Sequence, residues 1–361
     1  MVADLTRDGK VVSAHIDTLT ELGAKQSRPM TRGDVVIAVS GAPGLPAILA
    51  HDACIHDGFV GLRDLDRKRL DADFLYAYLT FVRATSNGKA VGAIFKNLTT
   101  DQIKGIDIPE LPLAEQRRIA EVLDRAEALR AKRRAALAQL DSLTQSLFLD
   151  LFGDPVINSK KWPRVEFSKL LANIDSGWSP VCLDRPIMGD EWGILKLGAV
   201  TWCEYNASEN KALPPGVEPD SAIEVKRGDL LFARKNTYEL VAACALVRET
   251  PPKLMMSDLI FRLRLQPEAK IDSTFLHQLL IYPTKRREIQ KLAGGSSGSM
   301  PNISKARLQT TVIEVPPIEL QREFARRVTA VETLKTAHRA SLAELDALFA
   351  TLQHRAFRGE L

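Results

Sequence analysis

The feature that constrains this chain most is a long stretch from Pro112 to Pro155, in which no glycine or proline occurs between Pro112 and Gly153. Proline suits the first turn of a helix, and a glycine followed by a proline commonly ends one. The stretch therefore predicts a single helix of roughly 36 residues, about 54 Å long at a rise of 1.5 Å per residue. A helix of that length in mid-chain is more typical of a spacer than of a core element.

Apolar residues recur along this stretch in steps of three and four, while the remaining faces are dense in charged side chains. This spacing places the apolar residues in one narrow seam, as in a coiled coil, and so predicts a partner helix. The seam residues are Val122, Ala126, Leu129, Ala136, Leu140, Leu143 and Leu147.

A second amphipathic stretch begins at Pro317 and matches the first at a constant offset of 205 residues. The first helix carries the chain from the first domain to the second. The second helix has the same apolar seam, and it buries that seam best by running back beside the first helix, seam against seam. The repeat therefore predicts an antiparallel pair with a globular domain at each end; the alternative is that each helix packs only on its own domain. The offset carries Pro112, Gln116-Arg117, Leu129, Leu140-Asp141, Leu143, Leu147 and Phe152 onto Pro317, Gln321-Arg322, Leu334, Leu345-Asp346, Leu348, Leu352 and Phe357.

The segments that precede and follow the first long stretch share a mixed α/β character, with short β-rich runs between glycine and proline turns. Their Arg-Gly-Asp strand starts, at Gly33 and Gly228, correspond at an offset of 195, so insertions separate the two sets of anchors. The predicted strands are Asp34–Val39, Ile194–Leu197, Asp229–Ala233 and Val241–Val247, and the predicted helices are Phe74–Arg83 and Phe275–Leu280.

Composition sets limits on partners and compartment. The net charge of +4 permits a nucleic-acid partner without requiring one. The four cysteines have no paired spacing and the N-terminus has no apolar stretch, which predicts reduced thiols and a cytoplasmic protein. The longest apolar run, Leu240–Val247, is too short to cross a bilayer and is predicted to be a buried strand, so no membrane role is expected.

These residues resemble the specificity subunits of type I restriction-modification systems. The likeness covers nearly the whole chain and rests on three features: the stretch LPLAEQRRIAEVLDRAEALRAKRRAALAQLDSLTQSLFLDLFGDP, its echo VPPIELQREFARRV ending in RAFRGEL, and the two Gly-Asp strand starts. The resemblance implies an α+β fold with two mixed α/β target-recognition domains, separated by two long antiparallel coiled-coil helices. The expected boundaries are 1–111 and 154–316 for the domains, and 112–153 and 317–361 for the spacer helices.

The same resemblance implies a non-catalytic subunit that reads a bipartite double-stranded DNA target. It would direct two modification subunits, which bind S-adenosylmethionine and methylate adenine, and two motor-nuclease restriction subunits. No cofactor is expected in this chain; S-adenosylmethionine, ATP and Mg are expected on the partner subunits. The alternative is a coiled-coil scaffold or partner-binding protein with a degenerate DNA-binding domain.

The first domain departs from the family pattern. The second domain contains Ser176-Gly177-Trp178-Ser179-Pro180, which is similar to an early Gly-x-Ser/Thr-Pro turn of the family. The first domain has no such turn before Gly33, and Met1–Leu5 matches the point where Leu197–Val200 stands in the second. The first domain is therefore expected to lack its opening strand and turn.

Sequence-specific DNA binding needs cations, hydroxyls and backbone amides for phosphates, and Arg, Lys, Asn or Gln for base edges. In the second domain, Arg234–Tyr238 places two cations, an amide and an aromatic ring on one loop after a strand. The hydroxyl-rich Gly294–Ser299 suits a phosphate backbone, and a plain linker is the alternative. The predicted DNA-binding residues there are Gly177, Ser179, Lys196, Arg234, Lys235, Asn236, Tyr238, Ser296, Ser297 and Asn302.

In the first domain the matching loops predict DNA contacts at Ser40, Gly41, Lys89, Lys96 and Asn97, with ordinary turns as the alternative. The basic run around Arg130 to Arg134 is interleaved with acidic residues, which favours a solvated or partner-facing surface over DNA contact.

Signatures of catalysis are absent from the sequence. No phosphate-binding loop, dinucleotide-binding glycine pattern, amino-methyltransferase motif or nucleophile elbow occurs in it. No metal site is predicted either, because strand alternation would place His51 and His56 on opposite faces and no second ligand cluster exists. An enzyme acting through His51, Cys54 and His56 is the remaining catalytic alternative.

Overall fold

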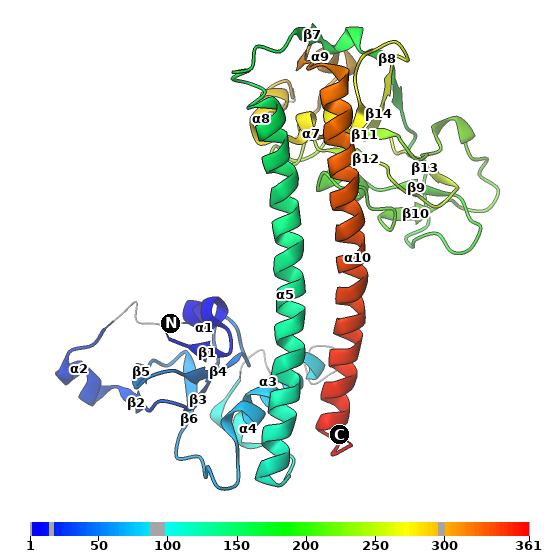
Figure 1. The fold of residues 1–361 in the computed structure, drawn as a ribbon. Helices are drawn as coiled ribbons and strands as arrows, with labels where there is room; N and C mark the ends of the chain where they lie inside the picture. Colours follow the sequence, from blue (N-terminus) through cyan, green and yellow to red (C-terminus); the bar gives the residue numbers. More distant parts are fainter. Residues whose placement is uncertain (1, 14–17, 87–97, 295–299, 361) are drawn as a thin grey trace. The chain divides into compact units, whose positions relative to one another are not determined.

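The computed structural model describes residues 2–13, 18–86, 98–294 and 300–360 (Figure 1). The chain forms two compact units, unit 1 with residues 1–136 and 338–361, and unit 2 with residues 137–337. Each unit combines a β-rich domain with part of both long helices, α5 (Leu113–Phe152) and α10 (Ile318–Ala356). The units thus divide both helices near the middle, and the finer boundaries expected from the sequence stay predictions.

Contacts between α5 and α10 show that the helices pack antiparallel, which confirms the predicted fold class. In unit 1, Arg130 Nε donates to Asp346 Oδ1 at 2.6 Å. In unit 2, Lys335 Nζ lies 2.7 Å from Asp141 Oδ1. Residue numbers thus rise along α5 as those of its partners fall along α10. The two ion pairs also correspond to each other at the 205-residue offset, so the repeat holds in the contacts as well as in the sequence.

The seam between the helices is narrower than the sequence pattern predicts. Val122, Ala126, Ala136, Leu140 and Leu147 are half-buried, as expected for seam positions. Two assignments are wrong. Leu129 and Leu143 are 53% and 42% exposed, and their counterparts Leu334 and Leu348 are 52% and 53% exposed. The helix turns about 100° per residue, and Arg130 and Arg133 occupy the half-buried positions beside Leu129 instead.

The C-terminus of α5 has a specific cap. Gly153 adopts φ +74°, and its N–H donates to the Leu149 carbonyl at 2.8 Å. Lys160 Nζ donates to the Asp150 and Leu151 carbonyls, at 2.5 and 3.0 Å. A cation that donates to the last carbonyls satisfies groups that the helix itself leaves without partners.

The domain of unit 1 is built around a four-stranded sheet with the order β1-β4-β3-β6, in which β3 pairs antiparallel with β4 and β6. Its strands are β1 (Val11–Val12), β2 (Arg28–Met30), β3 (Val35–Ala38), β4 (Pro46–Leu49), β5 (Ala53–Ile55) and β6 (Phe59–Leu62), with β2 and β5 forming a separate pair. Its helices are α1 (Val2–Asp8), α2 (Glu21–Gln26), α3 (Ala72–Ser86) and α4 (Thr100–Lys104). Leu75 and Leu79 of α3 pack against Val35, Ile37 and Ile48 of the sheet.

The domain of unit 2 has a larger framework, with sheets ordered β12-β11-β14-β8 and β10-β9-β13 and the pair β15-β7. Its strands are β7 (Arg164–Glu166), β8 (Leu171–Ser176), β9 (Gly193–Leu195), β10 (Asn210–Ala212), β11 (Leu230–Ala233), β12 (Cys244–Leu246), β13 (Leu254–Met255), β14 (Ile260–Leu265) and β15 (Val312–Glu314). Its helices are α6 (Gly198–Thr201), α7 (Ser273–Ile281), α8 (Pro283–Gln290), α9 (Lys305–Gln309) and the 3₁₀ turns η2 (Phe167–Lys169) and η3 (Ser221–Ile223).

The two domains differ in how far the sheet extends beyond the strand that begins at Gly-Asp, which is β3 in unit 1 and β11 in unit 2. In unit 2, β14 pairs with β11 on one side and with β8 on the other. In unit 1, β6 pairs with β3, and the described residues contain no further strand beyond it. The expectation that the first domain lacks an opening strand stays a prediction.

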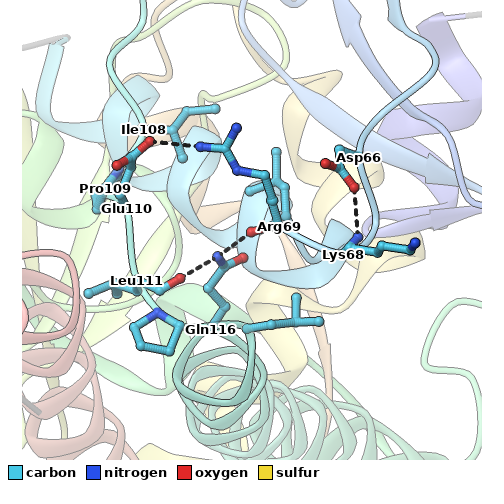
Figure 2. A pocket seen from close by; sticks show the side chains of 11 residues that line it. Asp66, Lys68, Arg69, Ile108, Pro109, Glu110, Leu111 and Gln116 are labelled. Carbon is cyan, nitrogen blue, oxygen red and sulfur yellow. Dashed lines mark hydrogen bonds and ion pairs between the residues drawn. The ribbon is translucent and has the colours of Figure 1, made fainter.

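A buried glutamine ties the start of α5 to its domain (Figure 2). Gln116 Oε1 accepts from the Asp71 N–H at 2.9 Å. Gln116 Nε2 donates to the Arg69 and Leu111 carbonyls at 2.7 and 2.9 Å. Asp71 Oδ1 in turn accepts from the Phe74 N–H at the start of α3. A single side chain therefore joins the first turn of α5 to the segment that leads into α3.

Gln321 repeats this arrangement in unit 2. It accepts from the Asp272 N–H at 2.8 Å and donates to the Lys270 and Pro316 carbonyls at 3.1 and 2.7 Å. Asp272 caps α7 by accepting from the Phe275 N–H at 3.1 Å. The repeated Gln-Arg start of each long helix is thus explained by the glutamine, whose three hydrogen bonds fix that helix to its domain.

The strand starts at Gly33 and Gly228 are built alike, with φ of +83° and +92° that glycine adopts without strain. The following carboxylates fold back onto their own turns. Asp34 accepts from the Thr31 N–H, and Asp229 accepts from the Lys226 N–H, each at 2.8 Å.

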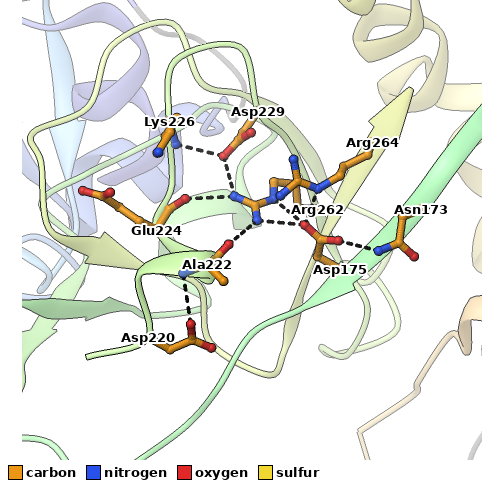
Figure 3. Close-up of polar contacts among 9 residues, drawn as sticks. All are labelled: Asn173, Asp175, Asp220, Ala222, Glu224, Lys226, Asp229, Arg262 and Arg264. Carbon is orange, nitrogen blue, oxygen red and sulfur yellow. Dashed lines mark hydrogen bonds and ion pairs between the residues drawn. The ribbon is translucent and has the colours of Figure 1, made fainter. Parts of the chain in front are cut away.

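Asp229 also belongs to a buried ionic network across the unit 2 sheet (Figure 3). Arg262, 3% exposed, pairs with Asp175 at 2.8 Å and with Asp229 at 3.2 Å, and donates to the Glu224 and Ala222 carbonyls. Burial alone would raise the pKa of Asp175, but hydrogen bonds and charges from Arg262 and Arg264 lower it below its ordinary value. The network joins β8 to β14, the pairing that has no counterpart in the described part of unit 1.

The predicted elements are found with shifted ends. The run Leu240–Val247 is buried from Val241 to Ala245, and only Cys244–Leu246 of it forms a strand. No helix in the described ranges is long and apolar enough to span a membrane.

Candidate nucleic-acid interface

The loop after β11 in unit 2 brings together residues that lie far apart in the sequence. Arg234 Nε donates to Asn302 Oδ1 at 3.1 Å, and Arg234 Nη1 lies 3.4 Å from the Asp258 carbonyl. The Asn302 backbone also bridges to Lys235 and exchanges two hydrogen bonds with Gly294. Two residues predicted independently as DNA contacts, Arg234 and Asn302, therefore touch each other.

The turn at Gly177, which follows β8, also lies next to Asp258. A Cβ on Gly177 would lie 2.3 Å from the Met256 and Ser257 carbonyl oxygens, so no larger residue fits this turn. Next to it, Ser179 Oγ hydrogen bonds to the Asp258 carboxylate and accepts from the Asp258 N–H at 3.2 Å. The geometry gives Gly177 a packing role, and it makes Asp258 the link between Ser179 and Arg234.

Two cationic side chains, Arg234 and Lys305, lie close to the ring of Phe261 in β14. The Arg234 guanidinium lies 4.9 Å and Lys305 Nζ 5.7 Å from the ring centroid. Phe261 itself is 1% exposed and belongs to the core, so both cations lie over a buried aromatic ring that attracts them electrostatically. We name this group, together with its neighbours, the Arg234 cluster: Ser179, Arg234, Lys235, Asp258, Asn302 and Lys305.

Asn236, on the same loop, is buried. It is only 6% exposed, its Nδ2 donates to Thr201 Oγ1 at 3.3 Å, and its Oδ1 accepts from the Thr237 N–H. An amide already engaged on both sides positions its loop; direct base contact by Asn236 stays a prediction that this geometry does not favour. Tyr238, two residues on, is 56% exposed.

Lys196 stands before α6, the helix that carries Thr201. Its Nζ lies 3.8 Å from Glu209 Oε2, and the two backbones also hydrogen bond at 2.8 Å. Through the bond between Thr201 and Asn236, this turn is connected to the Arg234 loop. Sequence reasoning missed Asp258, Lys305 and Thr201, because an isolated polar or basic residue carries no signal of its own.

In unit 1 the predicted loop after β3 is a tight turn. Ser40 and Gly41 are exposed, Gly41 has φ +70°, and Arg83 Nε donates to the Pro43 carbonyl at 3.1 Å to hold the turn. The other predicted contacts of the first domain, Lys89, Lys96 and Asn97, lie outside the described residues, as do Ser296 and Ser297 of the second.

Two other features of unit 1 give no evidence of a chemical site. Within the ranges that the structure describes, no group of three or more His, Cys, Asp or Glu residues could hold a metal ion. A cavity of about 590 Å³ opens beside the start of α5. Its polar groups bond to each other: Arg69 Nη2 to Glu110 at 3.1 Å and Gln116 to Leu111 (Figure 2). Arg69, Glu110 and Gln116, which line the cavity, are thus already hydrogen bonded to one another or to the backbone.

Comparison with known proteins identifies the family. The model for the type I restriction modification DNA specificity domain matches residues 7–139 and 196–347, which is most of the chain. The EcoKI type I restriction enzyme specificity subunit of Escherichia coli strain K12 is 25% identical over 99% of this chain and 81% of its own length. The EcoEI specificity subunit of Escherichia coli is 34% identical, but the alignment spans only 44% of this chain and 27% of that protein.

Solved structures show the same fold. The type I restriction-modification system S subunit from M. genitalium superposes with a TM-score of 0.59 and 14% identity, over 96% of this chain and 86% of that one. Specificity subunits of this kind are not themselves catalytic, in agreement with the absence of catalytic motifs from the sequence. With two domains matched by the family model and two antiparallel helices between them, the chain belongs to the family of DNA specificity subunits of type I restriction-modification systems.

Proposed function

We propose that the Arg234 cluster of unit 2 contacts one part of a two-part double-stranded DNA target, and that unit 1 contacts the other. The observation that carries this proposal is the direct, half-buried contact between Arg234 and Asn302, 68 residues apart in sequence, beside the end of β11. Guanidinium, ammonium, amide and hydroxyl groups gathered in this way match the donors that phosphates and base edges accept.

Neighbouring contacts support a role beyond simple solvation. The Asp258 carbonyl and the Asn302 amide orient the guanidinium of Arg234, and Phe261 supports it from the core. A side chain held in this way loses little conformational entropy when it binds. Base-specific contacts need a side chain with such a fixed geometry, and a fully solvated surface arginine does not have one.

The test is a paired substitution in the full chain. Arg234→Ala with Lys235→Ala removes two cations after β11, and Lys226→Ala with Arg227→Ala removes two exposed cations before the same strand. We expect the first pair to weaken specific DNA binding and to reduce its salt dependence, because each lost phosphate contact lowers the slope by about 1. The second pair should leave both unchanged. Equal behaviour of the two folded variants would remove the Arg234 loop from the interface.

We further propose that the chain assembles with two copies of a modification subunit and two of a restriction subunit. The modification subunit would bind S-adenosylmethionine and the restriction subunit ATP and Mg. The repeated exposed leucines support two equivalent partner sites. Unit 1 carries Leu129 and Leu348, unit 2 carries their counterparts Leu334 and Leu143, and all four are 42–53% exposed. Exposed leucines at corresponding positions of both units are what two equivalent partner contacts would require.

Native mass spectrometry of the assembled complex tests this arrangement. Leu129→Glu with Leu348→Glu should remove one modification subunit and leave the other bound, and Leu334→Glu with Leu143→Glu should do the same for the other site. Full occupancy in both variants would contradict the proposed surfaces.

A further inference from the structure

Trp202 is a large apolar side chain left in contact with solvent beside the Arg234 loop. It is 76% exposed and directly follows α6, whose other residues from Ala199 to Thr201 are buried. Trp162 and Trp192, in contrast, are half-buried against the body of unit 2. A single exposed apolar residue needs no explanation by itself. The backbone on both sides of Trp202, however, is held in place by hydrogen bonds, which suggests a function for the exposed ring.

The residue before Trp202 is fixed to the Arg234 loop. Thr201 Oγ1 donates to the Leu197 carbonyl at 2.8 Å and accepts from Asn236 Nδ2 at 3.3 Å. Both Thr201 and Asn236 are buried, at 9% and 6% exposure. The loop that carries Arg234 and Lys235 and the turn that carries Trp202 therefore form one connected support.

The residue after Trp202 is fixed from the opposite side. Cys203 has φ +63°, a left-handed conformation that is strained for a non-glycine residue. Its carbonyl lies 3.2 Å from His277 Nε2, which also lies 3.1 Å from the Cys244 carbonyl. Because carbonyls only accept, Nε2 carries the proton and donates to both. Burial lowers the pKa of His277 to about 4, so the ring is neutral near pH 7.

We infer that Trp202 is a specificity-determining residue, whose indole contacts the 5-methyl group of a thymine in the half-site read by unit 2. This inference rests on the proposed function of the Arg234 cluster. The thymine methyl is the apolar group that base pairs present in the major groove, and an apolar side chain recognises it by direct contact. A strained turn anchored on both sides is what a fixed base-reading side chain requires, since a loose indole would not discriminate between positions.

The test uses the full chain and duplexes that contain its target sequence, obtained from the methylation pattern of cells that express it. Trp202→Ala should weaken binding to the target about tenfold, leave binding to an unrelated duplex unchanged, and leave the salt slope unchanged, because no charge is removed. Trp202→Phe should retain most of the discrimination. Ile157→Ala is the matched control, since Ile157 is 74% exposed on the same unit.

Replacing thymine by uracil in one half-site at a time supplies the chemical half of the experiment. The wild-type protein should bind a uracil-containing duplex about fourfold more weakly for the lost methyl group, in one half-site only. Trp202→Ala should be insensitive to the same replacement.

The two proposals fail differently. If the wild-type protein does not distinguish target from unrelated DNA, the proposed function fails. If it does distinguish them and the folded Trp202→Ala variant keeps the same ratio, or still responds to uracil, then Trp202 is not a reading residue while the proposed function stands.

Discussion

Arg133 of α5 and His338 of α10 contact each other, with 3.0 Å between Arg133 Nη1 and His338 Nδ1, and they are also counterparts at the 205-residue offset of the repeat. Residues that correspond to one another meet only at a local twofold axis between antiparallel helices. Because arginine only donates, His338 Nδ1 must accept. The polar midpoint of the seam is thus a directional contact that favours one register of the two helices.

A substitution at His338 tests this register contact. His338→Lys would place two cations against each other, and we expect the free energy of unfolding to fall by about 1 kcal/mol. His338→Gln keeps an acceptor and should be close to neutral. Calorimetric unfolding of the two variants measures the difference, and equal stabilities would show that the contact contributes nothing to helix pairing.

Gln321 is predicted to be the stronger determinant of stability. Its side chain is fully buried and makes three hydrogen bonds with the backbone. Gln321→Leu strands one N–H and two carbonyls, so we expect a loss of about 2–4 kcal/mol. Arg322→Ala, at an exposed neighbouring position, should cost less than 0.5 kcal/mol. All four tryptophans lie in unit 2, so their fluorescence during urea unfolding reports this unit; a Gln321→Leu midpoint like that of Arg322→Ala would contradict the assignment.

His277 predicts a pH dependence of unit 2. Burial lowers the pKa of His277 to about 4, from an ordinary value near 6.5. Between these values the unfolded chain binds the proton and the folded chain does not, so stability falls as the pH falls through this window. The expected slope is up to about 1.4 kcal/mol per pH unit, relative to His277→Gln. Urea midpoints at pH 7, 6, 5 and 4 measure it, and parallel curves for both proteins would refute it.

The helix pair is predicted to set the length of the unread gap in the target. Adding four residues at the middle of both α5 and α10 lengthens each helix by about 6 Å, which corresponds to roughly two base pairs. Methylation motifs from cells carrying the lengthened chain should therefore show a gap longer by about two base pairs. An unchanged gap would rule out the helices as the spacer.

The sequence predicts the long helices and their antiparallel packing, because their repeat has a constant offset and their ends carry strong signals at Pro112, Gly153 and Pro317. It predicts the seam less well. Leu129 and Leu143 recur at the same spacing as the residues that are buried in the seam. Spacing alone does not show which of two neighbouring apolar faces of a helix is buried. The role of Gln116 was also hidden, since its partner Asp71 lies in another segment of the chain.

The candidate site was predicted in part. Residue type predicts Arg234, Lys235 and Asn302, and the structure brings them together through β11 and the segment before α9. An amide in a basic loop predicts DNA contact for Asn236, whereas its burial against Thr201 depends on tertiary packing. Trp202 gave no signal for the same reason, as its exposure follows from how α6 packs.

The central claim is most directly tested by methylome sequencing of cells that carry this chain with its modification and restriction subunits. The account predicts one methylated motif made of two unlike parts separated by a fixed unread gap, and loss of the part read by unit 2 when Arg234 and Lys235 are replaced by alanine. A continuous or strictly palindromic motif, or a motif unchanged by those substitutions, would contradict it.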